Sequence, residues 1–306
     1  MRLSKAAAAF LRYCSEERHV SPNTICAYRQ DLAEFQSYIG GSRIVRTLGA
    51  SDVLNYRNAL TSIRNLAPAT IKRRVACIRT MFAWLVRRGV LETSPFAKTD
   101  LRIHVPARLP RCLDPRDLRC LLRHRRRCGP DIALAVALLL ATGMRVGELA
   151  ALRIDDIDAD TGRLRILGKG SRERTVFVIN SQLRSELQKY LSVRHAGANV
   201  HGASLLADDR GRALTTARIR FLIAHVARAS GIRRHVTPHM LRHTAATMLL
   251  ESGTDVRFVQ RLLGHRSIVT TQIYTHVSDR ALQKALARAD VFRAYAGSKS
   301  GRSHDN

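Results

Sequence analysis

Several residue types and patterns are scarce or absent in this chain of 306 residues. Aromatic side chains make up only 5% of it, which argues against a single-strand nucleic-acid binder that works mainly by stacking bases on rings. The longest apolar run, residues 132–144, is shorter than the about 20 residues of a membrane-spanning helix, so it predicts a buried core helix. The sequence has neither a G-x-x-x-x-G-K-S/T loop nor a cluster of carboxylates, so we expect no nucleotide, metal or other cofactor.

Cysteine pairs at the C-x-x-C spacing of common zinc sites are also absent. All six cysteines fall in the amino-terminal half: Cys14, Cys26, Cys77, Cys112, Cys120 and Cys128. They predict free, mostly buried thiols in a reducing cytoplasm. The apolar start of the chain faintly resembles a signal peptide, but Arg12 interrupts it and polar residues come next, which favours a helix start. We therefore expect a cytoplasmic protein with no membrane partner.

Acidic residues are few, and basic residues dominate. Lys and Arg number 52 against 24 Asp and Glu, which gives a net charge of +28 and an isoelectric point near 11.3. A domain this basic has the electrostatic footprint of a nucleic-acid binder, whose affinity falls steeply with salt. A solvated basic surface or a membrane-surface protein is the alternative. Those classes predict a polybasic tail or one basic amphipathic helix, whereas here the charge runs through the whole chain.

The first hundred residues have the periodicity of amphipathic helices. Ser21 followed by Pro22 predicts a capped helix start, and Gly40 predicts its end. The apolar stripe between them comprises Ile25, Tyr28, Leu32, Phe35 and Ile39. A second helix is predicted from Pro68, with Ile71, Val75, Ile78, Phe82 and Leu85 on its inner face. Its other face carries Lys72, Arg73, Arg74 and Arg79, which either stay solvated or contact a DNA backbone.

A proline-punctuated segment between residues 99 and 111 predicts a linker between two domains. Asp114 and Pro115 then predict a capped helix that begins the second domain. Within that domain, residues 164–167 and 174–178 are β-prone runs on either side of glycines, which predicts a hairpin. The remainder is expected to be helical.

The second domain also contains the side chains that suit chemistry on a phosphodiester. Arginine offers a planar fork of donors that matches phosphate oxygens, and histidine moves protons near neutral pH. Tyrosine can attack phosphorus and carry it as a covalent ester. The candidates are Arg145, Lys169, His239, Arg242, His265 and Tyr274. Arg145 stands near Glu148, which we expect to support the local turn, and Gly143 and Gly147 would let the backbone bend there.

This pattern resembles the tyrosine recombinase (phage integrase) family, and within it the Xer recombinases. Residues 21–32 and 69–89 are also similar to the DNA-clamping domain of that family. Together with the catalytic candidates, the resemblance covers roughly residues 8–280. It implies a mainly α protein of two domains. The first is an all-helical amino-terminal core-binding (SAM-like) domain at 1–104, which a linker at 105–112 joins to the second. The second, at 113–296, is a mostly α catalytic domain with a small antiparallel β-sheet (the DNA breaking-rejoining fold). A disordered tail at 297–306 is expected to follow.

The resemblance also implies the role of each candidate. Tyr274 would be the nucleophile, and Arg145 and Arg242 would hold the non-bridging oxygens of the scissile phosphate. His239 would accept the tyrosine proton, His265 would donate to the phosphate, and Lys169 would protonate the leaving 5′ oxygen, with Arg172 or Arg174 as possible substitutes. The expected DNA contacts are Lys72, Arg73, Arg74 and Arg172.

His239 and His243 share a helix face, as a pair of metal ligands would. A metalloprotease motif needs glutamate directly after the first histidine, but Met240 stands there. We therefore expect no metal site, and we expect His243 to be a packing residue.

Three functions fit these residues. The first is a site-specific recombinase that binds double-stranded DNA as a homotetramer, with or without a paralogous recombinase, and acts through a 3′-phosphotyrosyl intermediate and a Holliday junction. The second is a monomeric type IB topoisomerase-like enzyme, and the third is a DNA-binding regulator without catalysis. The amino-terminal domain favours the first. Residues 291–297 depart from the His-Pro-Arg ending of Xer proteins, so integration or excision of a mobile element and resolution of plasmid or chromosome dimers both stay open.

Overall fold

The structure is a computed structural model that describes residues 1–97, 99–106, 112–168, 173–195, 202–208, 210–263, 283, 286 and 287. The chain divides into two compact units, Met1–Arg108 and Leu109–Asn306. The predicted linker at 105–112 falls largely outside the described residues, as does the predicted tail at 297–306, so these boundaries stay predictions.

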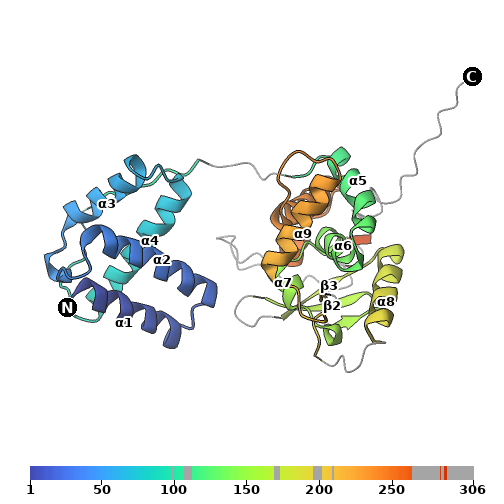
Figure 1. Ribbon diagram of the computed structural model, residues 1–306, viewed down its shortest axis with the longest axis horizontal. Helices are drawn as coiled ribbons and strands as arrows, with labels where there is room; N and C mark the ends of the chain where they lie inside the picture. The colour runs from blue at the N-terminus through green and yellow to red at the C-terminus, as the bar shows by residue number, and fades with distance from the viewer. Residues whose placement is uncertain are drawn as a thin grey trace, which may run out of the picture. The chain divides into compact units, whose positions relative to one another are not determined.

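The elements described in the amino-terminal unit are all helices, joined by turns and loops (Figure 1). Its elements are α1 (Leu3–Glu16), α2 (Pro22–Ile39), the short 3₁₀ helix η1 (Val45–Thr47), α3 (Ala50–Ser62) and α4 (Pro68–Arg87). Helix α2 packs against α1, α3 and α4. The predicted start and end of α2 are confirmed, because Ser21 accepts a hydrogen bond from the Thr24 amide and Gly40 comes next after the helix with a positive φ of 94°.

The core of this unit is built by the predicted stripes. All five inner-face residues of α4 are buried, whereas on α2 only Leu32 and Phe35 are fully buried and the other three pack at the edge. The expectation of mostly buried thiols is wrong for the chain as a whole. Cys14 and Cys77 are buried, but Cys26 is exposed and the remaining three cysteines are half-buried.

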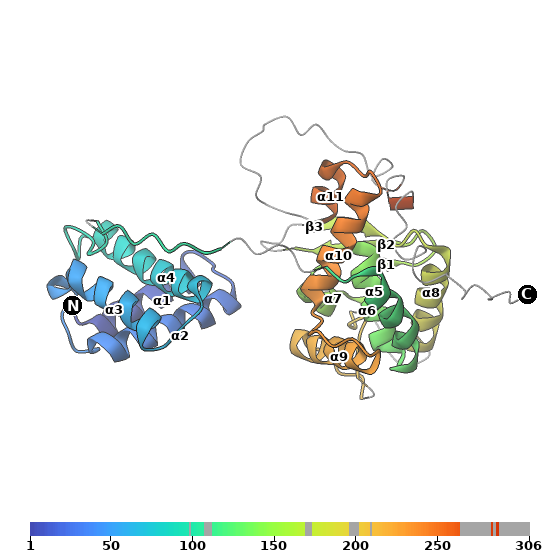
Figure 2. The same cartoon turned by 90° about the horizontal axis from the view of Figure 1, so that it is seen from above.

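The second unit is a set of helices with one small sheet (Figures 1 and 2). Its helices are α5 (Pro115–His124), η2 (Arg125–Arg127), α6 (Pro130–Thr142), α7 (Val146–Ala151), η3 (Ile154–Asp156), α8 (Ser181–His195), α9 (Thr216–Ala229), α10 (Pro238–Glu251) and α11 (Val256–Leu263). The predicted cap of α5 is confirmed, since the Asp114 carboxylate accepts from the Asp117 amide at 2.8 Å. Helix α6 is the buried core helix predicted from the apolar run, and it contacts α7, α8, α9 and α10.

The sheet is antiparallel, in the order β1 (Ile157–Asp158), β2 (Arg163–Leu167) and β3 (Glu173–Phe177). Strands β2 and β3 form the predicted hairpin, in which Leu164 pairs with Val176 and both side chains are buried. The mostly α domain with a small antiparallel sheet is therefore confirmed. Within the described part of the chain, no helix is both long and apolar enough to cross a membrane.

Candidate active site

The junction between α6 and α7 carries Arg145. Helix α6 ends at Thr142, and Gly143 takes the left-handed conformation with φ of 62°, which turns the chain sharply. Arg145 then becomes the residue that caps α7, with extended backbone angles, and its side chain is 45% exposed. The sequence predicted this bend at Gly143. Gly147, in contrast, lies within α7 and has no positive φ.

Glu148 is the buried acid of the site. It is 7% exposed and accepts hydrogen bonds from the Arg145 amide at 2.7 Å and from Arg145 Nη1 at 2.9 Å. Arg174 on β3 donates to both of its oxygens, at 2.7 and 2.8 Å. Burial opposes the charge, but the bonds from Arg174 and the Arg145 amide outweigh it and hold the pKa of Glu148 below its ordinary value. Glu148 supports the turn, as expected, and also binds a second arginine.

Arg242 is the buried arginine of the site, 4% exposed in the first turns of α10. Its Nη1 donates to the Gly143 carbonyl at 2.7 Å and its Nη2 to the Leu263 carbonyl at 2.6 Å. Burial, and then repulsion from Arg145, lowers the pKa of Arg242 to about 10, so it is still a cation at neutral pH. A guanidinium has five N–H groups, so these two carbonyls leave donors for an oxyanion.

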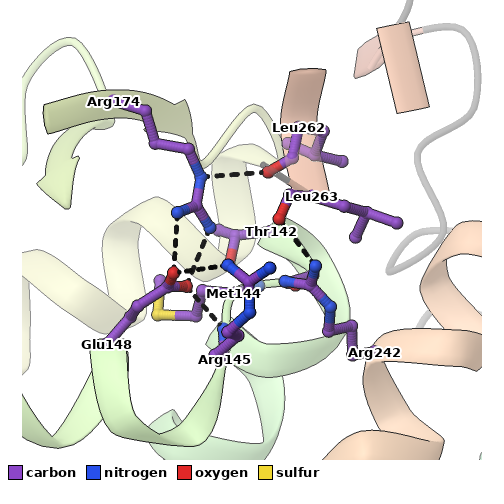
Figure 3. A network of polar contacts seen from close by, with 9 residues as sticks. Thr142, Met144, Arg145, Glu148, Arg174, Arg242, Leu262 and Leu263 are labelled. Atoms are coloured by element: carbon purple, nitrogen blue, oxygen red, sulfur yellow. Dashed lines mark hydrogen bonds and ion pairs between the residues drawn. The ribbon is translucent and has the colours of Figure 1, made fainter. Parts of the chain in front are cut away.

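The guanidinium groups of Arg145, Arg174 and Arg242 thus gather around Glu148 and the end of α11 (Figure 3). The sequence left Arg174 open as a substitute for Lys169 in protonating a leaving group, and that role stays a prediction. The structure holds its side chain, which is 16% exposed, against Glu148 and the Leu262 carbonyl. Arg174 was therefore missed as part of the site.

His239 and His243 form a pair on α10. Their Nε2 atoms lie 2.8 Å apart and their rings meet edge to face, with centroids at 4.2 Å. His239 is exposed and His243 is half-buried. Burial first, and then His239 and Arg242, lowers the pKa of His243. His243 is therefore more than the packing residue that we expected, because its ring nitrogen bonds to His239. Among the described residues, no three His, Cys, Asp or Glu side chains gather as a metal site would need.

The other candidates of the catalytic unit lie outside the described residues: Lys169, Arg172, His265 and Tyr274. In sequence, Lys169 and Arg172 fall between β2 and β3, and His265 comes two residues after the end of α11. The described geometry therefore brings together Arg145 and Arg242 of the predicted set and adds Glu148 and Arg174. It places His239 beside His243 on α10, the helix that also carries Arg242.

The predicted DNA contacts on α4 differ from one another. Lys72 is exposed. Arg73 pairs with Asp31, whose side chain is 1% exposed, although half of Arg73 itself reaches solvent. Arg74 is 17% exposed and pairs with Glu34. Arg74 therefore balances charge within its own unit, and Lys72 is the candidate best placed to meet a ligand.

Two family models match the chain. The model of the phage integrase family matches residues 112–281, and the model of the phage integrase N-terminal SAM-like domain matches residues 7–89. Together they span the amino-terminal helices and nearly all of the second unit.

Similar proteins include tyrosine recombinase XerC of Roseiflexus castenholzii, which is 37% identical over 287 residues, 90% of each chain. Tyrosine recombinase XerD of Listeria monocytogenes is 34% identical over 299 residues, 94% of this chain and 96% of that protein. Among solved structures, the Tn1549 transposon integrase in complex with transposon right end DNA has 18% identity and a TM-score of 0.73, covering 94% of this chain and 99% of that one. This likeness concerns the fold.

Nothing in these matches supports the topoisomerase alternative. The chain belongs to the phage integrase family and is a tyrosine-type site-specific recombinase.

Proposed function

We propose that this recombinase exchanges strands between two specific double-stranded DNA sites, with Tyr274 as its nucleophile and Arg145 and Arg242 holding the scissile phosphate. The observation that carries the proposal is the position of these two arginines. One comes directly after the turn at the end of α6 and the other lies on α10, yet Arg242 donates to the carbonyl of Gly143, two residues before Arg145. The fold therefore sets both cations at one place before any substrate arrives.

Such an arrangement suits in-line attack at phosphorus. Charge builds up on the non-bridging oxygens in the transition state, and donors already aimed at that position lower the barrier. Arg242 is buried, where the dielectric is low and its hydrogen bonds to an anion are strong. Losing one such donor typically costs about 2.7–4 kcal/mol of transition-state stabilisation.

The remaining steps follow the roles that the family resemblance implies for the other candidates. Tyr274 Oη attacks phosphorus, and its proton passes to His239. The P–O5′ bond breaks, Lys169 protonates the departing 5′ oxygen, and His265 donates to a phosphate oxygen. The 5′ hydroxyl of a partner strand then attacks the 3′-phosphotyrosyl bond, which restores the diester and releases the tyrosine. Each exchange conserves the energy of the bond that it breaks.

We further propose a homotetramer on two synapsed sites, with a Holliday junction between the two rounds of exchange. A lambda integrase tetramer bound to a Holliday junction shares this fold with a TM-score of 0.70, which supports that architecture. Both XerC and XerD proteins are similar to this chain, so pairing with a paralogue is a variant of the same proposal. The biological role is mobile-element integration or excision, or resolution of plasmid or chromosome dimers.

The test is covalent trapping. Wild type and Tyr274→Phe are incubated with nicked suicide duplexes from the gene's own genomic surroundings, in EDTA, and the products are run on a denaturing gel. Tyr38→Phe is the matched control, because Tyr38 is an exposed tyrosine of the other unit. We expect an adduct and strand exchange with wild type and Tyr38→Phe, and neither with Tyr274→Phe. An adduct that survives in Tyr274→Phe would refute the assignment of the nucleophile.

A further inference from the structure

Arg174 connects three elements around the site, namely β3, α7 and α11. It lies on β3, and each of its three nitrogens donates to a protein acceptor: Nη1 and Nη2 to Glu148, and Nε to the Leu262 carbonyl at 3.2 Å (Figure 3). Its side chain is 16% exposed. Because its donors point into the protein, Arg174 is poorly placed to bind DNA itself.

Two arginines meet the last two carbonyls of α11. Arg174 donates to Leu262 and Arg242 donates to Leu263. Both carbonyls stand at the carboxyl end of the eight residues described in α11, where the helix dipole favours a cation. A helical segment of this length is stabilised only weakly by its own hydrogen bonds, so the two arginines contribute to holding its end.

The end of α11 leads directly into the remaining catalytic candidates. Leu263 is followed by Gly264 and His265, and Tyr274 comes nine residues after His265. The two arginines therefore fix the point at which the chain enters the segment that carries the proposed nucleophile.

Arg174 is also connected, through Glu148, to Arg145, which is proposed to bind the phosphate. Glu148 bonds to Arg174 with both oxygens and also to Arg145, through the amide and the side chain. A single buried carboxylate thus connects the arginine on β3 with the arginine that holds the phosphate. One chain of contacts runs from Arg145 through Glu148 and Arg174 to Leu262.

We propose that Arg174 is a positioning residue that holds Leu262, at the end of α11, at a fixed place relative to Arg145, and that attack by Tyr274, which follows α11 in sequence, depends on this contact. The inference rests on the proposed function, because it assigns Arg174 a part in that reaction. Attack at phosphorus requires the nucleophile and the phosphate to meet with small error, and a misplacement of about 1 Å can cost about 100-fold in rate.

Arg174→Lys separates positioning from folding. A lysine keeps a cation opposite Glu148, but a single ammonium group cannot reproduce the fork on the carboxylate together with the bond to Leu262. The matched control is Arg165→Lys on the neighbouring strand β2. Arg165 also donates two nitrogens to one carboxylate, but that carboxylate belongs to Asp156 of η3, and the Arg165 side chain is 56% exposed.

The measurement is the single-turnover rate of adduct formation at saturating suicide duplex, with the Kd for the same duplex and the melting temperature measured in parallel. For Arg174→Lys we expect a Kd and a melting temperature near those of wild type and a rate about 100-fold lower. Arg165→Lys should cut at the wild-type rate. A fall in rate that is matched by loss of folding or of DNA binding would overturn the positioning role.

A second substrate tests whether Arg174 acts only through Lys169, which precedes it in the sequence. A duplex with sulfur in place of the bridging 5′ oxygen has a leaving group that needs no proton, so it should restore cleavage by Lys169→Ala. It should leave Arg174→Lys slow, and full restoration of that variant would overturn the inference. If wild type forms no adduct at all, the proposed function fails and the inference falls with it. If wild type and Arg174→Lys cut equally fast, only the inference fails.

Discussion

The Nε2 atoms of His239 and His243 lie 2.8 Å apart on one face of α10. At that distance one nitrogen must donate a proton and the other must accept it, so the two rings cannot both be cations while the bond lasts. Burial, His239 and Arg242 lower the pKa of His243, which favours the neutral form that the pair requires. His239, which is proposed to take the tyrosine proton, therefore has a hydrogen-bond partner in His243 that orients its ring and shares a proton with it.

Replacing His243 should change how cleavage depends on pH. In wild type, acid adds a proton to this pair through His243, whose pKa is lowered, so the cleavage rate should fall at a pH below the ordinary 6.5 of histidine. His243→Gln offers a side chain that does not titrate, so the part of the acid limb that belongs to His243 should be missing. The measurement is the single-turnover rate between pH 5 and 8. Identical acid limbs in the two proteins would show that His243 has no part in the proton transfer.

Glu148→Gln should make the stability of the catalytic unit less dependent on pH. The pKa of Glu148 is below its ordinary value of 4.5, so the folded state binds this proton less readily than the unfolded chain. The ion pairs therefore stabilise the fold fully above pH 4.5, and that stabilisation is lost as the pH falls through the lowered pKa.

At pH 7, Glu148→Gln should lower the free energy of unfolding by about 3–5 kcal/mol, because Arg174 is left without its buried partner. The difference from wild type should shrink on acidification, as measured by urea denaturation from pH 7 to pH 3.5. Asp156→Asn is the control, since its partner Arg165 is 56% exposed and surface pairs contribute about 1 kcal/mol or less. A Glu148→Gln deficit that is constant over this range would contradict the assignment.

Gly143→Ala should weaken the site through the backbone. Gly143 has a positive φ of 62°, which costs an L-residue with a Cβ about 1–2 kcal/mol. The added Cβ would also come within 2.9 Å of Leu263 Cδ2, at the end of α11 that Arg242 holds. We expect a loss of stability of that size together with slower cleavage, whereas Gly147→Ala, which meets nothing within 4 Å, should keep both. Equal effects of the two substitutions would contradict this interpretation.

The elements were predictable where the signal is local. Ser21, Pro22 and Gly40 mark the ends of α2 because a cap depends on residues within one turn. The inner stripe of α4 was predictable because one buried face repeats with the helix period. The hairpin of β2 and β3 was predictable in the same way from two β-prone runs around glycines.

The partners of charged residues were not predictable, because they come from distant segments. Arg73 and Arg74 looked like a DNA-binding face with Lys72, yet their partners Asp31 and Glu34 lie on α2. In the sequence, Arg174 is one of several basic residues in the predicted β-hairpin, and only the tertiary fold brings Glu148 and Leu262 into contact with it. A sequence shows where charge is, whereas the tertiary fold decides which charge stays solvated.

That distinction gives the last prediction, for the basic face of α4. Lys72 is exposed, so Lys72→Ala should weaken binding to all duplexes alike and reduce the slope of log K against log salt by about 1. Arg74 is 17% exposed and paired with Glu34, so Arg74→Ala should leave the slope near that of wild type and instead lower the stability of the amino-terminal unit by about 1–3 kcal/mol. Binding titrations at low and high salt and urea denaturation separate the two effects. An Arg74→Ala variant that keeps its stability but loses one unit of slope would show that Arg74 leaves Glu34 to bind a phosphate. A Lys72→Ala variant that alters sequence preference alone would show that Lys72 contacts bases rather than the DNA backbone.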